Sequence, residues 1–440
     1  MCMPMTGARR STSFLLALTT AAGASLLTGC GVLPGITGGS REPLTVMTWA
    51  PDGTQATNMP GMPATAVAFS RWVNDNGGID GHRLKVLTCN EQNTNIGAGN
   101  CARRAVKEGA VAVVGSYSQF GSAFMPPLEA AGIPFIGGYG ISGEEFTSTD
   151  SYPVNGGQAA LLAGNGRQLA RDCERVALVR PDTIDGDDLP PLINSGLTEG
   201  SRHEVADIRA ADDAGDYSSV AAQALERAGA GPGVPARIGR SAARQQARKG
   251  CVTAVLGERT ETFLDSFRRV ETADQKVRIS SVVGSVGQAL IDSTGGKEGP
   301  FEGAYVTGWY PESGDPRWDA MRRVVDKYAF GDNRIDTDDA GVQTTWIAYT
   351  VLKQAVESLD KDSVSTRELA GRLDHGQPVT TGGLTPALRW DFASMLASAD
   401  FPRVVNRSVT YQVVRQGRLV AQRKGFVNVG PTLENARTSG

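Results

Sequence analysis

The sequence contains few histidines and none of the common catalytic or zinc-binding motifs. Only three of its 440 residues are histidine, and no two cysteines have CxxC spacing, which excludes the usual zinc sites. The chain also lacks a GxSxG elbow, an HExxH pair, a Walker loop and a phosphate-binding GxGxxG at a strand–helix junction. We therefore expect no enzymatic activity, no cofactor and no metal site.

Long apolar segments and an excess of positive charge are absent as well. Downstream of residue 30, no apolar segment reaches the roughly 20 residues needed to span a bilayer. Loss of Arg9 and Arg10 with an N-terminal signal reduces the 44 basic residues to 42, against 47 acidic ones, and leaves no basic stripe for nucleic acid. About 410 residues then remain, which is enough for two domains.

The N-terminus has the pattern of a lipoprotein signal. Two arginines and a short apolar segment lead into Leu27-Thr28-Gly29-Cys30. This pattern predicts a signal peptide over 1–29, cleaved so that Cys30 becomes a lipidated first residue. A chance cysteine after an ordinary signal peptide is the alternative, and the export route stays open. We expect residues 30–43 to form a flexible tether that anchors the protein at the extracytoplasmic face of the cell membrane.

Four cysteines remain in the mature chain, and an even number in an exported protein favours disulfides. Three pairings exist, of which we expect Cys89–Cys101 and Cys173–Cys251. Cys89 ends an expected strand, and Cys101 lies in the helix that follows. Cys173 and Cys251 each precede a strand, and these two strands are expected to be parallel neighbours. Four buried thiols are the alternative.

Short apolar strands alternate with amphipathic helices in two consecutive series, which predicts parallel sheets covered by helices on both faces. The first series has strands at 44–50, 84–88, 110–114 and 133–136 and helices at 63–76, 98–108 and 122–131. The second has strands at 175–180, 203–208, 252–256 and 277–283 and helices at 157–171, 188–198, 216–228 and 259–269. A strand at 302–308, helices at 316–329, 340–359 and 365–373, and a strand pair at 408–415 and 418–424 follow.

Two such series predict an α/β protein with two doubly wound parallel-sheet lobes. We expect the first lobe to contain residues 44–153 and 310–388, the second lobe residues 154–309 and 389–430, and a tail over 431–440. An insertion rich in glycine, proline and arginine over 229–250 is expected to be a solvated loop. Contact of this insertion with anionic lipid or a partner is the alternative.

One stretch resembles a known family of binding proteins. Residues 72–87, Trp-Val-Asn-Asp-Asn-Gly-Gly-Ile-Asp-Gly-His-Arg-Leu-Lys-Val-Leu, resemble the N-x-x-GG-I-x-G-x-x-L-x-v signature of the leucine/isoleucine/valine-type periplasmic binding proteins. Residues 102–106, 112–115 and 130–136 continue the similarity. Asp216-Tyr217-Ser218 is similar to the family's D-[FY]-S motif in the second lobe.

The resemblance covers residues 44–425 and is strongest over 64–137. It implies the type I fold of that family, with Venus-flytrap architecture, in which two lobes are joined by three chain crossings that act as a hinge. It also implies that a ligand binds between the lobes and that the protein is the substrate-binding lipoprotein of an ABC importer.

Ligands of open α/β sheets bind beyond the carboxyl ends of the strands, so the loops after the expected strands form the candidate site. Glycines there let backbone amides approach a ligand, and hydroxyl, carboxamide and charged side chains can orient it. The candidate ligand-binding residues are Trp49, Ser116, Ser118, Gln119, Gly138, Tyr139, Ser142, Asp182, Asp185, Glu258, Arg259 and Ser285.

The resemblance implies roles for some of these residues. In relatives that bind aliphatic amino acids, hydroxyl and backbone groups of the loops corresponding to 116–119 and 138–142 hold the carboxylate. An acidic residue commonly receives the ammonium group, but Ser285 occupies that position here. Asp182, Asp185 or Glu258 would have to replace it, because an unpaired buried ammonium costs several kcal/mol. The alternative is a different polar ligand, such as an amide or a small organic acid held by Arg259.

Structural roles are the alternatives for several single candidates. For Asp185 the alternative role is to begin a helix, because carboxylates stabilise helix N-termini. Glu258 and Arg259 can form a surface ion pair with each other. Trp49 can belong to the core of its lobe instead of the cleft.

Together these features predict an extracytoplasmic solute-binding lipoprotein. It would capture a small polar metabolite (an amino acid, an amide or a related organic acid) between its lobes and deliver it to an ABC transporter permease. We expect a monomer whose partners are that ligand, the permease and the membrane, the last through the lipid on Cys30. A ligand-sensing or interaction module of the same fold, acting with a signalling partner, is the alternative function.

Overall fold

The computed structural model describes residues 41–55, 57–211, 214–230, 249–257, 259–272, 276–282 and 286–436. The expected signal peptide, the expected lipidation site at Cys30 and most of the expected tether and insertion lie outside these residues. Within the described part of the chain, the predicted order of strands and helices is found, and it forms two sheets with helices on both faces.

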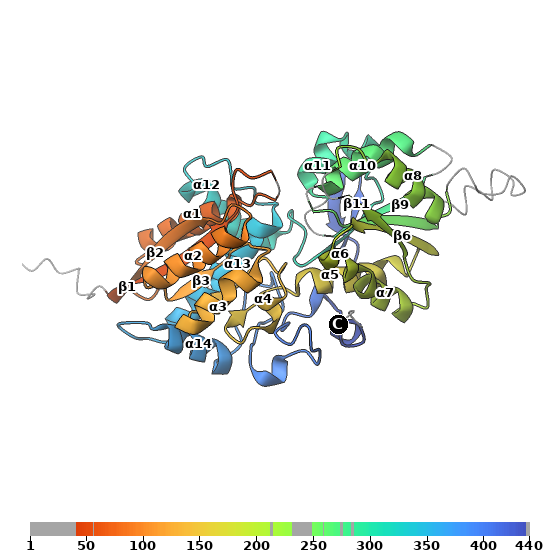
Figure 1. The fold of residues 1–440 in the computed structure, drawn as a ribbon. Helices are drawn as coiled ribbons and strands as arrows, with labels where there is room; N and C mark the ends of the chain where they lie inside the picture. The colour runs from red at the N-terminus through yellow and green to blue at the C-terminus, as the bar shows by residue number, and fades with distance from the viewer. Residues whose placement is uncertain are drawn as a thin grey trace, which may run out of the picture. The chain divides into compact units, whose positions relative to one another are not determined.

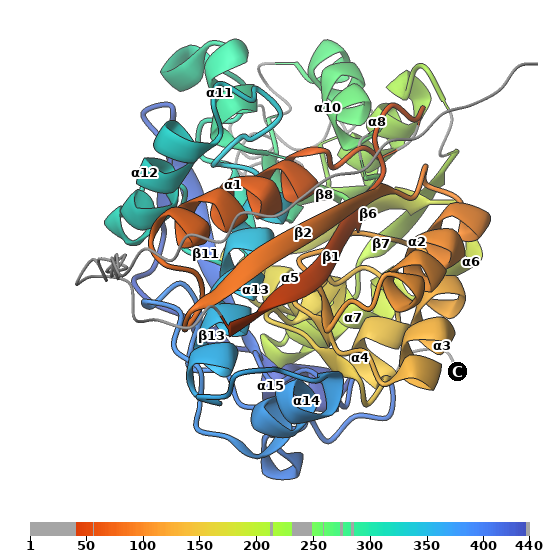
Figure 2. The ribbon, with the colours of Figure 1, turned by 90° about the vertical axis from the view of Figure 1, so that its left-hand side faces the viewer.

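The first lobe is built on five parallel strands in the order β2-β1-β3-β4-β5 (Figure 1). Residues 46–50 of β1 are buried without interruption, because helices cover both faces of this strand. Helices α1 and α13 pack on one face, and α2 and α3 on the other. Figure 2 shows β1 and β2 between α1 and α2. The elements of this lobe are β1 Arg41–Ala50, α1 Gly61–Asp75, β2 His82–Asn90, α2 Asn95–Lys107, β3 Ala112–Val114, α3 Gly121–Ala131, β4 Phe135–Ile136, α4 Glu144–Thr147, β5 Ser151–Tyr152, η2 Pro316–Trp318, α12 Asp319–Tyr328, α13 Ala340–Glu357 and α14 Thr366–His375.

The second lobe is built on a sheet with the strand order β12-β11-β10-β9-β8-β6-β7, and β13 pairs with β11. Its strands are parallel from β7 to β10, whereas β11 pairs antiparallel with both β10 and β12. Helices α5 and α7 pack on one face, and α8 and α10 on the other. The elements of this lobe are α5 Gly157–Leu169, β6 Arg175–Pro181, α6 Ile184–Asp187, α7 Leu189–Glu199, β7 Ala206–Ala210, α8 Ser218–Arg227, β8 Gly250–Ala254, α10 Arg259–Val270, β9 Arg278–Val282, α11 Gln288–Ser293, η1 Gly296–Glu298, β10 Tyr305–Gly308, β11 Ser408–Arg415, β12 Arg418–Ala421, β13 Val427–Asn428 and α15 Gly430–Glu434.

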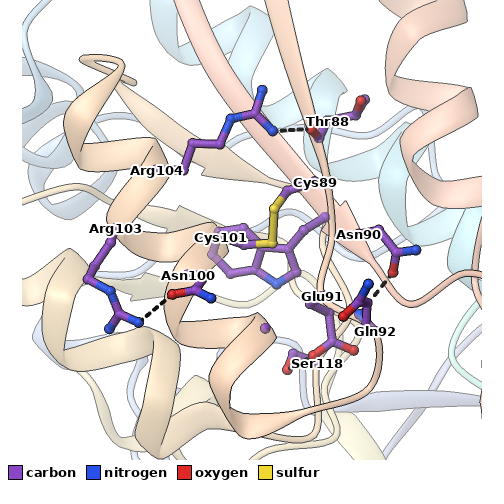
Figure 3. The surroundings of a disulfide bond; sticks show 12 residues. Thr88, Cys89, Asn90, Glu91, Gln92, Asn100, Cys101, Arg103, Arg104 and Ser118 are labelled. Carbon is purple, nitrogen blue, oxygen red and sulfur yellow. Dashed lines mark hydrogen bonds between the residues drawn. A yellow bond between two sulfur atoms is a disulfide. The ribbon is translucent and has the colours of Figure 1, made fainter.

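Both predicted disulfides are confirmed. Cys89–Cys101 joins the end of β2 to α2 (Figure 3), and its Cα atoms are 5.8 Å apart. Cys173–Cys251 joins the start of β6 to β8, with a Cα–Cα distance of 5.9 Å. These two strands are parallel neighbours, as the pairing argument required. Each disulfide therefore cross-links elements of one lobe.

Several short elements carry no sequence pattern and were not predicted. Strand β5 has two residues, which is too short for a periodicity, whereas β4 falls within the strand expected at 133–136. Helix α15, in the segment expected to be a tail, packs on α5 and α7. Trp390 and Arg403 were expected in the second lobe, but Trp390 Nε1 donates to Pro153 O and Arg403 donates to Ser151 O next to β5. The chain segment before β11 therefore packs on the first lobe.

Three chain crossings connect the lobes, at residues 153–157, 308–311 and 403–408. Buried amides tie them to one another: Asn155 Nδ2 donates to Tyr310 Oη at 3.2 Å, and Asn406 Nδ2 donates to Val154 O at 2.9 Å. Trp309 Nε1 donates to Gly157 O at 2.9 Å. The crossings thus form one hydrogen-bonded group, as the type I fold requires of a hinge.

The backbones of helices α5 and α7 are in contact at Gly166 of α5 and Gly196 of α7. A Cβ atom at Gly166 would lie 2.1 Å from Ile193 O. We expect Gly166→Ala to push the helices apart and to lower the free energy of unfolding by about 1–3 kcal/mol, which urea denaturation measures. The matched control is Gly371→Ala in α14, where a Cβ meets nothing within 4 Å. This control should stabilise the protein by about 0.5–1 kcal/mol, and equal effects of the two substitutions would contradict the packing argument.

Candidate functional site

A cavity of about 590 Å³ lies at the second crossing and is lined by residues of both lobes. The second lobe contributes the turn before α10 and the turn before α11. The first lobe contributes Gln55, the loop before α13 and the first turn of α13. Tyr310, in the crossing itself, closes one side. The cavity thus has the position expected of a ligand site between two α/β sheets.

Carboxylates dominate the charged wall of this cavity. Arg259 is the single basic residue on the wall in the described part of the chain. None of the carboxylates forms an ion pair with a described residue. The acidic residues that line the cavity are Glu261, Glu312, Asp336, Asp338 and Asp339. The wall therefore carries an excess of negative charge.

Burial and mutual repulsion affect the carboxyl groups of the loop before α13. Burial raises the pKa of Asp338, and the neighbouring charge of Asp336 adds to this shift. Burial likewise raises the pKa of Asp339, although this carboxylate accepts a hydrogen bond from Val342 N as the N-cap of α13. A positive charge placed in the cavity would favour the ionised forms of both groups.

Two buried glutamines add hydrogen-bond acceptors to the wall. Gln343 is 6% exposed, and its Nε2 donates to Thr337 O at 3.1 Å. Gln412 is 5% exposed, and its Nε2 donates to Tyr310 O at 3.0 Å. These carbonyl acceptors determine which way each amide is oriented, because a flipped amide would place two acceptors together. The Oε1 atoms of both residues accept no hydrogen bond from the described part of the chain.

The loop at 116–119, a predicted ligand loop, has its polar groups paired within the first lobe. Ser116 Oγ accepts from Trp49 N at 3.1 Å. Ser118 Oγ donates to Glu91 Oε2 at 3.0 Å, and these two residues lie together beside the first disulfide in Figure 3. Gln119 Nε2 donates to Asn93 Oδ1 at 3.1 Å. Each of these three side chains therefore has a hydrogen-bond partner within the first lobe.

The loop at 138–142 is occupied in the same way by a carboxylate of the chain itself. Glu145 Oε1 accepts from the backbone N–H groups of Ile141 and Ser142, each at 3.1 Å, and Oε2 accepts from Gly140 N at 3.0 Å. Ser142 Oγ donates to Oε1 at 3.2 Å. A Cβ at Gly138 would lie 1.9 Å from Glu145 Oε2. The backbone amides expected to hold a ligand carboxylate therefore hold Glu145.

The two internal glutamates titrate near neutral pH. Burial raises the pKa of Glu145 to about 7 against the opposing hydrogen bonds from the 140–142 loop. Burial also raises the pKa of Glu91 to about 7, with the Ser118 hydrogen bond acting in the opposite direction. Protonation of either glutamate leaves its carboxyl group in place, so both loops stay occupied across this range.

The remaining predicted site residues lie in different places. Trp49 is in the core of the first lobe against Phe124 and Phe135, so core packing, the alternative role, describes its position. Tyr139 is buried between Tyr117 and Trp309. Asp182 is exposed and accepts a hydrogen bond from Arg209. Among the predicted residues that the structure describes, only Arg259 lines the cavity. Glu258, Ser285 and the side chain of Asp185 lie outside the described residues.

Sequence reasoning missed most of the cavity wall. Gln343 is in the first turn of α13, and Gln412 is in an antiparallel strand, so neither follows a parallel strand. The acidic loop Asp336-Thr-Asp-Asp339 was the one available signal, because four residues with three carboxylates precede a helix. The described residues contain no cluster of His, Cys, Asp and Glu suited to a metal ion, and no described helix is long and apolar enough to cross a membrane.

Comparison with known proteins identifies the family. The family model described as periplasmic binding protein matches residues 46–395. No curated protein matches the sequence. Solved structures with similar folds include a possible leucine/isoleucine/valine-binding protein from Rhodopirellula baltica, which is 15% identical, with 88% of this chain and 98% of that chain covered and a TM-score of 0.65.

Two further structures have a similar fold and a bound ligand. A branched-chain amino acid ABC transporter protein from Thermus thermophilus, with bound valine, is 15% identical, with 88% of this chain and 96% of that chain covered and a TM-score of 0.63. A solute-binding protein of an ABC transporter from Rhodopseudomonas palustris, in complex with 3,4-dihydroxybenzoic acid, is 12% identical, with 88% and 98% covered and a TM-score of 0.64. The chain therefore belongs to the periplasmic binding protein family and has its type I fold, which confirms the resemblance to the leucine/isoleucine/valine-type members.

Proposed function

We propose that this chain is the solute-binding lipoprotein of an ABC importer and that its solute occupies the cavity at the second crossing. The observation that carries the proposal is the cavity itself, which has residues of both lobes on its wall and a volume of about 590 Å³. This volume is in the usual range for small-molecule sites. A small polar metabolite of the size of an amino acid, an amide or a related organic acid fits it.

Delivery from the outer face of the membrane requires export and a partner. The Leu27-Thr28-Gly29-Cys30 sequence supports a lipid anchor on Cys30, and the two disulfides support an oxidising, extracytoplasmic compartment. A flexible tether would let a monomer collect solute near the membrane and then dock on the permease of the importer.

Filling the cavity with a side chain tests its role. Gly287 lines the cavity, and a Cβ built on it meets nothing within 4 Å, so Gly287→Leu can enter the cavity without strain on the backbone. Solutes are first identified by thermal shift against amino acids, amides, amines and small organic acids, since a ligand at about 100 times its Kd stabilises by about 2.7 kcal/mol. We expect Gly287→Leu to weaken binding of the identified solute by about 100-fold or more in calorimetry.

The matched control is Gly371→Leu on α14, where a new side chain also meets open space but lies outside the cavity. It should bind the solute as the unmodified chain does. Unchanged affinity in Gly287→Leu would place the solute elsewhere, and a panel without any binding solute would contradict the proposed function.

A further inference from the structure

Most of the polar side chains on the cavity wall carry hydrogen-bond acceptors. Gln343 and Gln412, each more than nine-tenths buried, have amide nitrogens committed to backbone carbonyls and amide oxygens that accept nothing from the described residues. Both oxygens keep the capacity to accept a hydrogen bond, so they suit a ligand that donates one. The two amide oxygens come from different elements, Gln343 from α13 and Gln412 from β11.

The charge on the wall indicates the same kind of ligand. Five carboxylates line the cavity against one guanidinium, and none of the five is paired with a cation in the described part of the chain. Repulsion among these carboxylates is relieved by a bound positive charge. Arg259, at the start of α10, is the one positive charge on the wall that opposes them in the described part of the chain.

Few groups on the cavity wall could hold a ligand carboxylate, and Arg259 is the single basic residue among those described. Three backbone N–H groups of the 140–142 loop converge on Glu145, an arrangement that otherwise makes a concave anion site. Ser118 donates to Glu91 in the neighbouring loop. Neither loop is among the residues that line the cavity, and these donors already hold carboxyl groups of the chain itself.

We propose that the solute of this protein is an organic cation, a primary amine or a related ammonium compound, that carries no free carboxylate. The inference rests on the proposed function and names the substrate class of the same cavity. Gln343, Gln412 and the acidic wall accept the hydrogen bonds and the charge of the ammonium group. The excess of carboxylates on the wall disfavours the corresponding amino acids, whose own carboxylate would add negative charge to the cavity.

Matched compound pairs test the substrate class. Calorimetry on the purified chain compares cadaverine with lysine, agmatine with arginine, isobutylamine with valine, and benzylamine with benzoate. We expect at least one amine to bind about tenfold or more tightly than its carboxylate counterpart, and its affinity to fall as sodium chloride is raised. A carboxylate that binds as tightly as its amine would overturn the inference and leave the proposed function standing. If no compound in these pairs or in the wider panel binds, the result would count against the inferred substrate class and against the proposed function.

Charge-removing variants test the wall. Glu312→Gln combined with Asp338→Asn removes two carboxylates from the cavity and spares Asp339, which caps α13. We expect this variant to bind the amine about tenfold more weakly, whereas Asp326→Asn, an exposed carboxylate of α12 outside the wall, should change the affinity less than about twofold. The melting temperature of each unliganded variant shows that it is folded. Equal affinities of the two variants would contradict the role of the acidic wall.

Discussion

Replacing Cys173 and Cys251 by serine is expected to lower the free energy of unfolding by about 4–5 kcal/mol. The bond closes a loop with a sequence separation of 78 residues, so its loss releases a large amount of conformational freedom in the unfolded chain. It also ends the covalent link between the neighbouring strands β6 and β8 at the start of the second sheet. Guanidinium denaturation of the oxidised protein and of the double serine variant measures the difference.

The other disulfide provides the matched comparison. Cys89–Cys101 closes a loop with a sequence separation of only 12 residues, and the same chain-entropy argument gives about 3 kcal/mol. The variant lacking Cys89 and Cys101 should therefore be more stable than the variant lacking the longer-range bond. The opposite order would show that local packing around Cys101, which is fully buried, outweighs loop length.

The free energy of unfolding is expected to fall as the pH rises from about 5 to about 8, by on the order of 2–3 kcal/mol through Glu145 alone. Burial raises the pKa of Glu145 from 4.5 to about 7, so the folded state keeps this proton at pH values where the unfolded state has lost it. The contribution of Glu145 to the free energy of unfolding is therefore fully present below the pKa of this residue in the unfolded chain. It is lost as the pH rises through the pKa of about 7 in the folded protein. Glu91 acts in the same direction, because its pKa is also raised to about 7.

Urea denaturation at intervals across this pH range measures the slope. Glu145→Gln is the informative variant, because its Oε1 can still accept from Ile141 and Ser142 but the side chain no longer ionises. The variant should show a clearly flatter pH dependence, with the contribution of Glu91 remaining. A slope equal to that of the unmodified protein would mean that Glu145 does not titrate in this range.

The architecture was predictable because it depends on patterns that are local in the chain. Runs such as Val46–Ala50 are apolar at every position because helices cover both faces, and this is visible in the sequence alone. The disulfides followed from the same reasoning, since Cys173 and Cys251 precede strands that a doubly wound sheet places side by side. Two-residue strands such as β5 have no such pattern and could not be found.

The cavity wall was much less predictable, for a physical reason. A polar side chain in a strand-end loop reveals that it can make hydrogen bonds, but not whether another residue of the chain already uses them. Glu145 lies only three residues after Ser142, yet nothing in that spacing shows that its carboxylate turns back onto the loop. Gln343 in α13 and Gln412 in β11 lie far apart in the chain and meet at the cavity only in the folded protein.

The positions of the two disulfides have a mechanical consequence. One cross-link lies within each lobe, and the three crossings are held to one another by hydrogen bonds such as those of Asn155 and Asn406. Oxidation thus stiffens the two bodies but leaves the joint between them free of covalent restraint. Neither disulfide therefore joins one lobe to the other or to a crossing. An oxidising environment can protect the lobes from unfolding without changing how readily the protein captures or releases its solute.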